Sequence, residues 1–210
     1  MNNKVLTALV AGAVVVAGAT VTAIRYFGGS PAVDAAVEIV PKDAWLYTNL
    51  FVDPSDDQKR ALDELLRHFP EIESTNDALN ELADFLDRAL LAEAGLEFER
   101  DIEPWLGDQM AFFLAGEQEP EADGALLLAT TDVDATRDAV RTAVERADTV
   151  GGPQEASYDG TDYEIIEQTS GPAVALGSVG DFFVVGSEQG FKDVVDVAGG
   201  EPSLGDSGSY

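Results

Sequence analysis

The stretch "PAVALGSVGDFFVVGSEQGFKDVVDVAGG" (172–200) contains two apolar runs, a glycine turn and an amphipathic segment in close succession. The β-branched and aromatic residues on either side of Val179-Gly180 predict a β-hairpin. The segment from about Glu188 predicts a short helix that ends at Gly199. This stretch therefore predicts antiparallel strands with a helix that packs back against them.

The same plan occurs twice earlier, in "NLFVDPSDDQKRALDEL" (49–65) and "LLLATTDVDATRDAV" (126–140), by internal duplication or by convergence on the same capping rules. "EASYDGTDYEIIEQ" (155–168) predicts a hairpin that turns at Asp159-Gly160. Thr131 and Asp134 predict a capping box for the helix that follows. The remaining patterns predict strands at 44–52, 108–116 and 124–131, and helices at 53–69 and 74–94.

Together these elements predict an α+β fold with two layers, in which amphipathic helices pack on one face of a mainly antiparallel sheet. One N-terminal transmembrane helix is expected to precede this fold. The expected division is a stub and anchor at 1–27, a linker at 28–40, an extracytoplasmic α+β domain at 41–200 and a tail at 201–210.

The anchor is predicted from Val5 to Ile24, an uncharged and mostly apolar span between Lys4 and Arg25. At about 1.5 Å per residue, such a helix crosses a hydrocarbon core of roughly 30 Å. A cleaved signal peptide, with "VTA" (21–23) as its cleavage site, and a buried soluble helix are the alternatives. The slight excess of positive charge before the span places the amino terminus in the cytoplasm and the body outside the cell membrane.

Charge separates the body from the anchor. Lys4 and Arg25 are the only charged side chains before Asp34, so the rest of the chain carries all 40 acidic residues and 10 of the 12 basic ones. A domain with this excess of carboxylates repels polyanions, which argues against nucleic acid and anionic lipid headgroups as partners. The membrane, through the span, and an envelope protein or peptide are the expected partners.

No catalytic motif stands out in the sequence. Cysteine is absent, His68 is the only histidine, and "GSVGD" (177–181) and "GSEQG" (186–190) do not have the spacing of a nucleophile elbow. Motifs for phosphate binding, dinucleotide binding or zinc are also absent from the sequence, and no cofactor is predicted. A pair of carboxylates for glycoside hydrolysis cannot be singled out.

Two groups of acids fit either a Ca²⁺ site or ordinary helix capping. The first consists of Asp53, Asp56 and Asp57, and the second of Asp132, Asp134 and Asp138. Capping needs no ligand and is the favoured interpretation at both places.

The segment "DIEPWLGDQMAFFLAG" (101–116) predicts a corner that leads into a strand. Pro104 biases the preceding residue toward extended geometry, and Gly107-Asp108 turns the chain. Trp105 is expected either to plug the end of the core or to face a ligand, with Asp108 and Gln109 beside it.

This segment, "VPKDAWLYTNLFVDPSDDQKRALDELLRHFP" (40–70) and "ALLLATTDVDA" (125–135) resemble a bacterial family of single-pass, membrane-anchored proteins grouped only as a domain of unknown function. The family is common in high-GC Gram-positive bacteria, and Pro-Trp-Leu-Gly-Asp-Gln (104–109) is the most specific element of the resemblance. It covers the anchor and nearly all of 38–210, and it implies no catalytic residues. Family members are typically longer, which implies a chain shortened at its carboxyl end; a complete protein with a short polar tail is the alternative.

Two classes of function follow. The favoured one is a non-enzymatic, membrane-tethered module of the cell envelope that binds its partner through sheet edges or the face around Trp105. The alternative is an envelope hydrolase whose catalytic residues lie in a missing carboxy-terminal part or among acids that the sequence does not single out.

Overall fold

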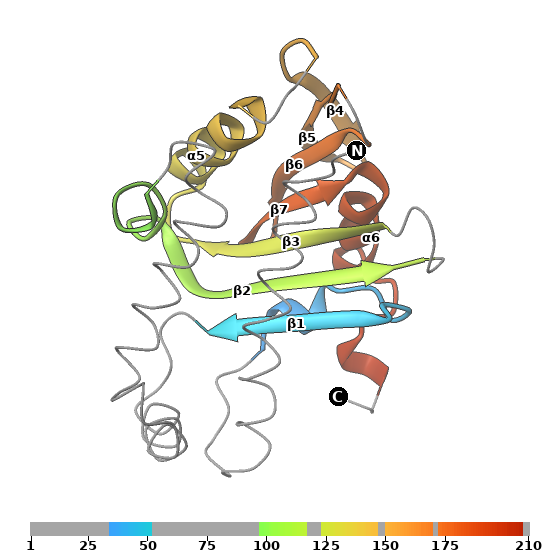
Figure 1. Cartoon of the computed structure of the whole chain (residues 1–210). Coiled ribbons are helices and arrows are strands. Elements are labelled where there is room, and N and C mark those ends of the chain that lie inside the picture. Colours follow the sequence, from blue (N-terminus) through green and yellow to red (C-terminus); the bar gives the residue numbers. More distant parts are fainter. Residues whose placement is uncertain (1–33, 52–96, 117–122, 147–149, 170–171, 208–210) are drawn as a thin grey trace, which may run out of the picture.

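The computed structural model describes residues 34–51, 97–116, 123–146, 150–169 and 172–207. Within them the strands form one antiparallel sheet in the order β1-β2-β3-β7-β6-β5-β4 (Figure 1). The strands are β1 (Leu46–Phe51), β2 (Leu106–Ala115), β3 (Asp123–Thr130), β4 (Gln154–Tyr158), β5 (Thr161–Ile166), β6 (Val174–Val179) and β7 (Phe182–Ser187). The helices are α5 (Val133–Arg146), α6 (Glu188–Ala198), the short 3₁₀ turns η1 (Ala36–Glu38) and η4 (Gly205–Ser207), and the π-helical turn η3 (Phe98–Ile102). The α+β class and the antiparallel sheet are confirmed.

Both predicted hairpins are present. The β4–β5 hairpin turns at Asp159 and Gly160, where φ is 45° and 81°, so the Asp-Gly pair supplies the left-handed conformation that a two-residue turn requires. The β6–β7 hairpin turns one residue later than predicted, at Gly180 and Asp181, because Val179 belongs to β6 and pairs with Phe182. Gly180 has a φ of 58°, which a β-branched valine does not readily adopt.

The prediction that helices pack on one face of the sheet is wrong. Phe191, Val194 and Val195 of α6 join a core cluster on one face, whereas Val144 of α5 joins a separate cluster on the other. Trp105 belongs to the α5 cluster. The sheet is therefore the middle layer between two helices, as the different positions of α5 and α6 around it show (Figure 1).

The central strands explain this arrangement. All six residues of β7 are buried, and β6 is buried at every position except Ser178. Phe182 and Val184 pack in the α6 cluster, whereas Phe183 and Val185 pack in the α5 cluster. A strand that is apolar at consecutive positions needs a partner layer on both faces, because successive side chains point to opposite sides.

The segments before β1 and after α6 lie together. Pro41 pairs with Ser203 in an isolated β-bridge, and Leu204 N–H donates to the Val40 carbonyl over 2.8 Å. Ala36 and Val40 are fully buried in the α6 cluster. Residues from the predicted linker and tail thus contribute to the same body as the sheet.

Several predicted elements lie outside the described residues: the span from Val5 to Ile24 and the helices at 53–69 and 74–94. Within the part of the chain that the structure describes, no helix is both long enough and apolar enough to cross a membrane.

Candidate functional site

The segment 104–109 contributes to both faces of the sheet. Trp105 is 4% exposed and packs in the α5 cluster, whereas Gln109 is 2% exposed and lies on the face of β2 that also bears Ala111 and Phe113. Asp108 is exposed. The three residues singled out by the sequence are therefore not gathered into one pocket. Trp105 precedes β2, and the register of β2 shifts between Leu106 and Met110, so strict alternation of faces does not run from Trp105 to Gln109.

Trp105 forms a hydrogen-bonded corner. Its carbonyl oxygen accepts three hydrogen bonds at the end of β3: from Thr131 N–H at 2.9 Å, from Thr131 Oγ1 at 3.1 Å and from Thr130 Oγ1 at 3.2 Å. Its indole N–H donates to the carbonyl of Asp101 in η3. A buried tryptophan whose one donor is satisfied inside the protein supports the corner and leaves no polar group for a ligand.

Gln109 belongs to a polar group that we call the Asp34 cluster, formed by Asp34, Tyr47, Asn49 and Gln109. The Asp34 carboxylate accepts hydrogen bonds from Tyr47 Oη at 2.8 Å and from Gln109 Nε2 at 3.3 Å. It also accepts from the backbone N–H of Val37 at 3.2 Å. Gln109 Oε1 in turn accepts from Ala35 N–H at 3.2 Å. The cluster therefore ties the segment that leads into η1 to strands β1 and β2.

The cluster is partly buried, and among the described residues not all of its polar groups have a partner. Asn49 is 7% exposed, and its Oδ1 accepts a long hydrogen bond of 3.4 Å from Gln109 Nε2. Within the described part of the structure, Asn49 Nδ2 has no hydrogen-bond partner. A buried amide without a partner is destabilising, so the cluster depends on the bonds that Gln109 and Asp34 do make.

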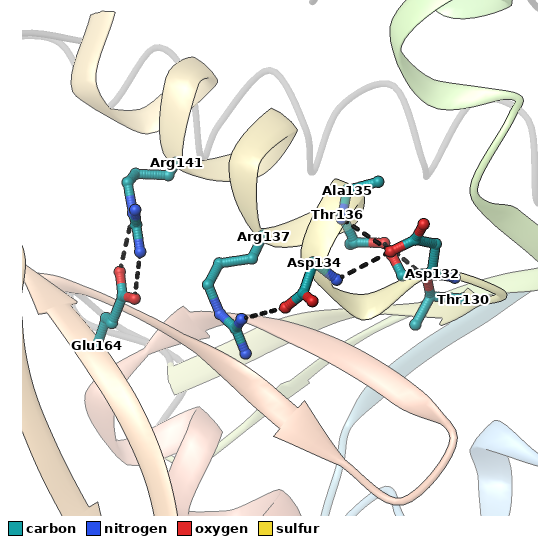
Figure 2. Close-up of polar contacts among 8 residues, drawn as sticks. All are labelled: Thr130, Asp132, Asp134, Ala135, Thr136, Arg137, Arg141 and Glu164. Carbon is teal, nitrogen blue, oxygen red and sulfur yellow. Dashed lines mark hydrogen bonds and ion pairs between the residues drawn. The ribbon is translucent and has the colours of Figure 1, made fainter.

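The start of α5 shows how its acids are used (Figure 2). Asp132 Oδ1 accepts from the backbone N–H groups of Asp134 at 3.1 Å and Ala135 at 3.0 Å, so Asp132 caps the helix. The predicted capping box of Thr131 and Asp134 is wrong. Thr131 instead bonds to Trp105, and the Asp134 carboxylate forms an ion pair with Arg137 at 2.9 Å.

Two further contacts fix α5 to the sheet (Figure 2). Thr136, which is fully buried, donates to the Asp132 carbonyl over 2.8 Å and lies 2.6 Å from Thr130 Oγ1. Arg141 forms a two-pronged ion pair with Glu164 of β5. The hydrogen bond to Glu164 raises the pKa of Arg141, which therefore stays charged.

Within the second acid group, Asp132 caps α5, which agrees with the favoured interpretation of that group as helix capping. Within the described ranges, no set of three or more histidine, cysteine, aspartate or glutamate side chains is arranged to hold a metal ion. The first group, Asp53, Asp56 and Asp57, lies outside those ranges, as does His68.

Ser187 occupies the turn from β7 into α6 in "GSEQG". Its Oγ accepts from Gly190 N–H at 3.0 Å and from Gly124 N–H at 3.3 Å, and donates to Asp123 Oδ1 at 3.0 Å. Ser187 is the N-cap of α6 and is 9% exposed. A hydroxyl that is buried and fully bonded in this way holds the helix to β3, and is not free to act as a nucleophile.

A second polar group lies on α6. Glu188 Oε1 accepts from Lys192 Nζ at 2.7 Å and from Tyr163 Oη at 3.1 Å. The bond to Glu188 raises the pKa of Lys192, the bond from Lys192 lowers that of Glu188, and burial raises that of Tyr163. Each shift keeps its group in the usual charge state at neutral pH, which is unlike a poised acid, base or nucleophile.

Among the described residues, the outer edge of β4 has no neighbouring strand. In the described sheet β4 pairs only with β5, and Gln154, Glu155 and Ser157 are exposed. Ala156 and Tyr158 are partly buried and pack against the α6 cluster. An open strand edge presents backbone N–H and C=O groups for pairing with another chain.

A family model described as "Protein of unknown function (DUF3352)" matches residues 8–210. The chain belongs to the DUF3352 family. This confirms membership of a family of unknown function. No curated protein and no solved structure matches the chain significantly.

For this DUF3352 protein, sequence analysis identified Gln109 but not its partner. Asp34 lies 75 residues away along the chain, and nothing in the pattern pairs an isolated aspartate with a strand glutamine. The role of Ser187 was also missed. Its signal was present, because a serine between an apolar strand and an amphipathic helix is a preferred N-cap.

Proposed function

We propose that this DUF3352 protein is a single-pass, membrane-anchored extracytoplasmic domain that binds an envelope partner without catalysis. The uncharged span from Val5 to Ile24 supports the anchor, and the strong excess of acids after it supports a solvated, extracytoplasmic body. We also propose that segment 104–109 is characteristic of the family, and that the protein comes from a high-GC Gram-positive bacterium.

The Asp34 cluster is the observation that carries this proposal. Asp34, the first residue that the structure describes, is bonded to both Tyr47 of β1 and Gln109 of β2 and is thereby tied to the sheet. Only residues 25–33 separate Asp34 from the end of the predicted span. Even fully extended, such a segment reaches about 30 Å. The body would therefore work close to the membrane surface, as suits a domain that contacts another envelope component.

The titratable groups support a non-catalytic role. Lys192 and Tyr163 both have a raised pKa, and the pKa of Glu188 is lowered. At neutral pH, Lys192 and Tyr163 therefore stay protonated and Glu188 stays ionised. Ser187 is buried in its cap. Binding through exposed surface requires none of these groups to change its protonation state.

Protease treatment of intact cells or spheroplasts that express the full chain tests the anchor and its orientation. We expect the body to be digested without breaking the membrane, and the chain to stay in the membrane fraction at alkaline pH. A matched chain that lacks residues 1–27 should leave that fraction. A body that is protected until the membrane is broken would refute the proposed orientation, and a full chain that is extracted at alkaline pH would refute the anchor.

A further inference from the structure

The backbone of β4 has two residues whose polar groups face away from the sheet. The turn at Asp159-Gly160 makes Tyr158 and Thr161 a hydrogen-bonded pair, and hydrogen-bonded pairs then alternate along the hairpin. By this alternation, the N–H and C=O groups of Glu155 and Ser157 point outward. Both residues are exposed, and among the described strands β4 pairs only with β5, so no described strand occupies this edge.

The two faces of this edge differ in chemistry. On the α6 face, Ala156 and Tyr158 are partly buried and continue the core cluster to the border of the sheet. On the α5 face, Glu155 lies directly opposite Glu164. Like charges in this position repel each other, and Arg141 pairs with Glu164 and leaves Glu155 without that compensation.

The hairpin as a whole is acidic. Residues 154–167 contain five carboxylates and no basic residue. The carboxylates are Glu155, Asp159, Asp162, Glu164 and Glu167. An added strand would therefore gain from Lys or Arg on the α5 face and from apolar residues on the α6 face.

We propose that the open edge of β4 binds an extended segment of a partner protein in which basic and apolar residues alternate. The segment adds to the sheet as a further strand: its backbone bonds to Glu155 and Ser157, its basic side chains neutralise Glu155, and its apolar side chains contact Ala156 and Tyr158. This inference rests on the proposed binding function and names the surface and the chemistry of the partner.

The test uses the full chain in nanodiscs of zwitterionic lipid, since anionic lipid would itself bind a basic peptide. The probe is a short fluorescent peptide in which Lys alternates with Val, and its binding is followed by polarisation. One control peptide has the same composition in Lys-Lys and Val-Val blocks. A second carries N-methyl groups at alternate residues, which removes backbone donors and leaves the charge unchanged.

The alternating peptide should bind at least about tenfold more tightly than either control peptide, because only it presents both the pattern and the backbone donors. Ser157→Pro removes an outward N–H without removing a bond to β5, and should weaken binding by about tenfold or more. Ser157→Val keeps the N–H and should bind as the unsubstituted chain does. Glu155→Lys should weaken binding of the Lys peptide and favour a peptide with Glu in its place.

Equal binding of the alternating and block peptides would overturn the proposal, because the interaction would then be general attraction to an acidic protein. Undiminished binding to Ser157→Pro would also overturn it. If that variant does not fold, the N-methylated peptide gives the same answer on the unsubstituted chain. A dimer that Ser157→Pro abolishes would instead assign the edge to a second copy. If no peptide binds although protease reaches the body in intact cells, the edge proposal fails while the anchored, extracytoplasmic body stands.

Discussion

Gly190→Ala should destabilise the protein, although alanine is the better helix former. Gly190 lies in the first turn of α6, where the helix lies against Gly124 of β3. A Cβ atom at this position would lie 2.5, 2.7 and 2.8 Å from the O, C and N atoms of Gly124. All three are backbone atoms of a central strand, so no side chain can rotate away to make room.

The size of the effect follows from two opposing contributions. Replacing glycine by alanine in a helix gains up to about 1 kcal/mol from propensity. An ordinary van der Waals contact requires α6 to move away by about 1 Å, and such overpacking costs roughly 1–3 kcal/mol. The shift also opens gaps around Phe191, Val194 and Val195, which are 0%, 0% and 4% exposed. We expect a net loss of about 1–2 kcal/mol in the free energy of unfolding.

Urea denaturation of the full chain in mild detergent measures this loss. Tryptophan fluorescence, recorded in the Trp45→Phe background so that the buried Trp105 alone reports on the core, follows unfolding. The change in midpoint at constant m gives the free energy difference. Gly152→Ala is the matched control, because a Cβ atom there meets nothing within 4 Å, and it should change stability by less than about 0.5 kcal/mol. If Gly190→Ala is neutral or stabilising while the control behaves as expected, the close contact between α6 and β3 is refuted.

Three other substitutions test the sites described above. Gln109→Ala should destabilise the protein by about 1–3 kcal/mol, because it leaves the groups bonded to Gln109 unpaired. It should also expose the chain near Asp34 to protease. Asp108→Ala, at an exposed position, should have neither effect. Trp105→Phe should cost about 1 kcal/mol or more, since it removes the indole donor and part of the ring; a melting temperature equal to that of the unsubstituted chain would contradict the corner. Burial raises the pKa of Asp193, so its ionisation destabilises the folded state at neutral pH and this destabilisation disappears as the pH falls below the unfolded value of about 4. Asp193→Asn should therefore raise the melting temperature at about pH 7 and leave it unchanged at about pH 3, and the opposite pH dependence would contradict the assigned cause.

The parts of the fold that local chemistry determines were predictable. Asp159-Gly160 allows a left-handed turn, and the helix from Glu188 ends at Gly199 as its pattern predicts. The arrangement of the layers was not inferred correctly, although a signal for it exists. Four consecutive apolar residues in β7, from Phe182 to Val185, predict a strand buried on both faces and hence a helix on each side.

The candidate sites depend on contacts that local patterns do not contain. Gln109 was singled out from its neighbours in the segment, but its burial depends on Asp34 and on the pairing of β1 with β2. Thr131 is of a residue type that often caps helices, but its hydroxyl group donates to the carbonyl oxygen of Trp105 instead. Such choices between partners are settled by tertiary structure, which no single-sequence rule evaluates.

The position of β7 has a consequence for the order in which the protein can fold. Among the described strands β7 is the last to be synthesised, yet it lies between β3 and β6 and bonds to both. Until residue 187 is available, β1-β2-β3 and β4-β5-β6 are two separate sheets, and each has an unpaired apolar strand at its inner edge. Unpaired apolar strand edges of this kind are hazards for aggregation while the chain is being made. Rapid completion of the chain up to β7, which pairs with both β3 and β6, would shorten the time for which these edges stay unpaired.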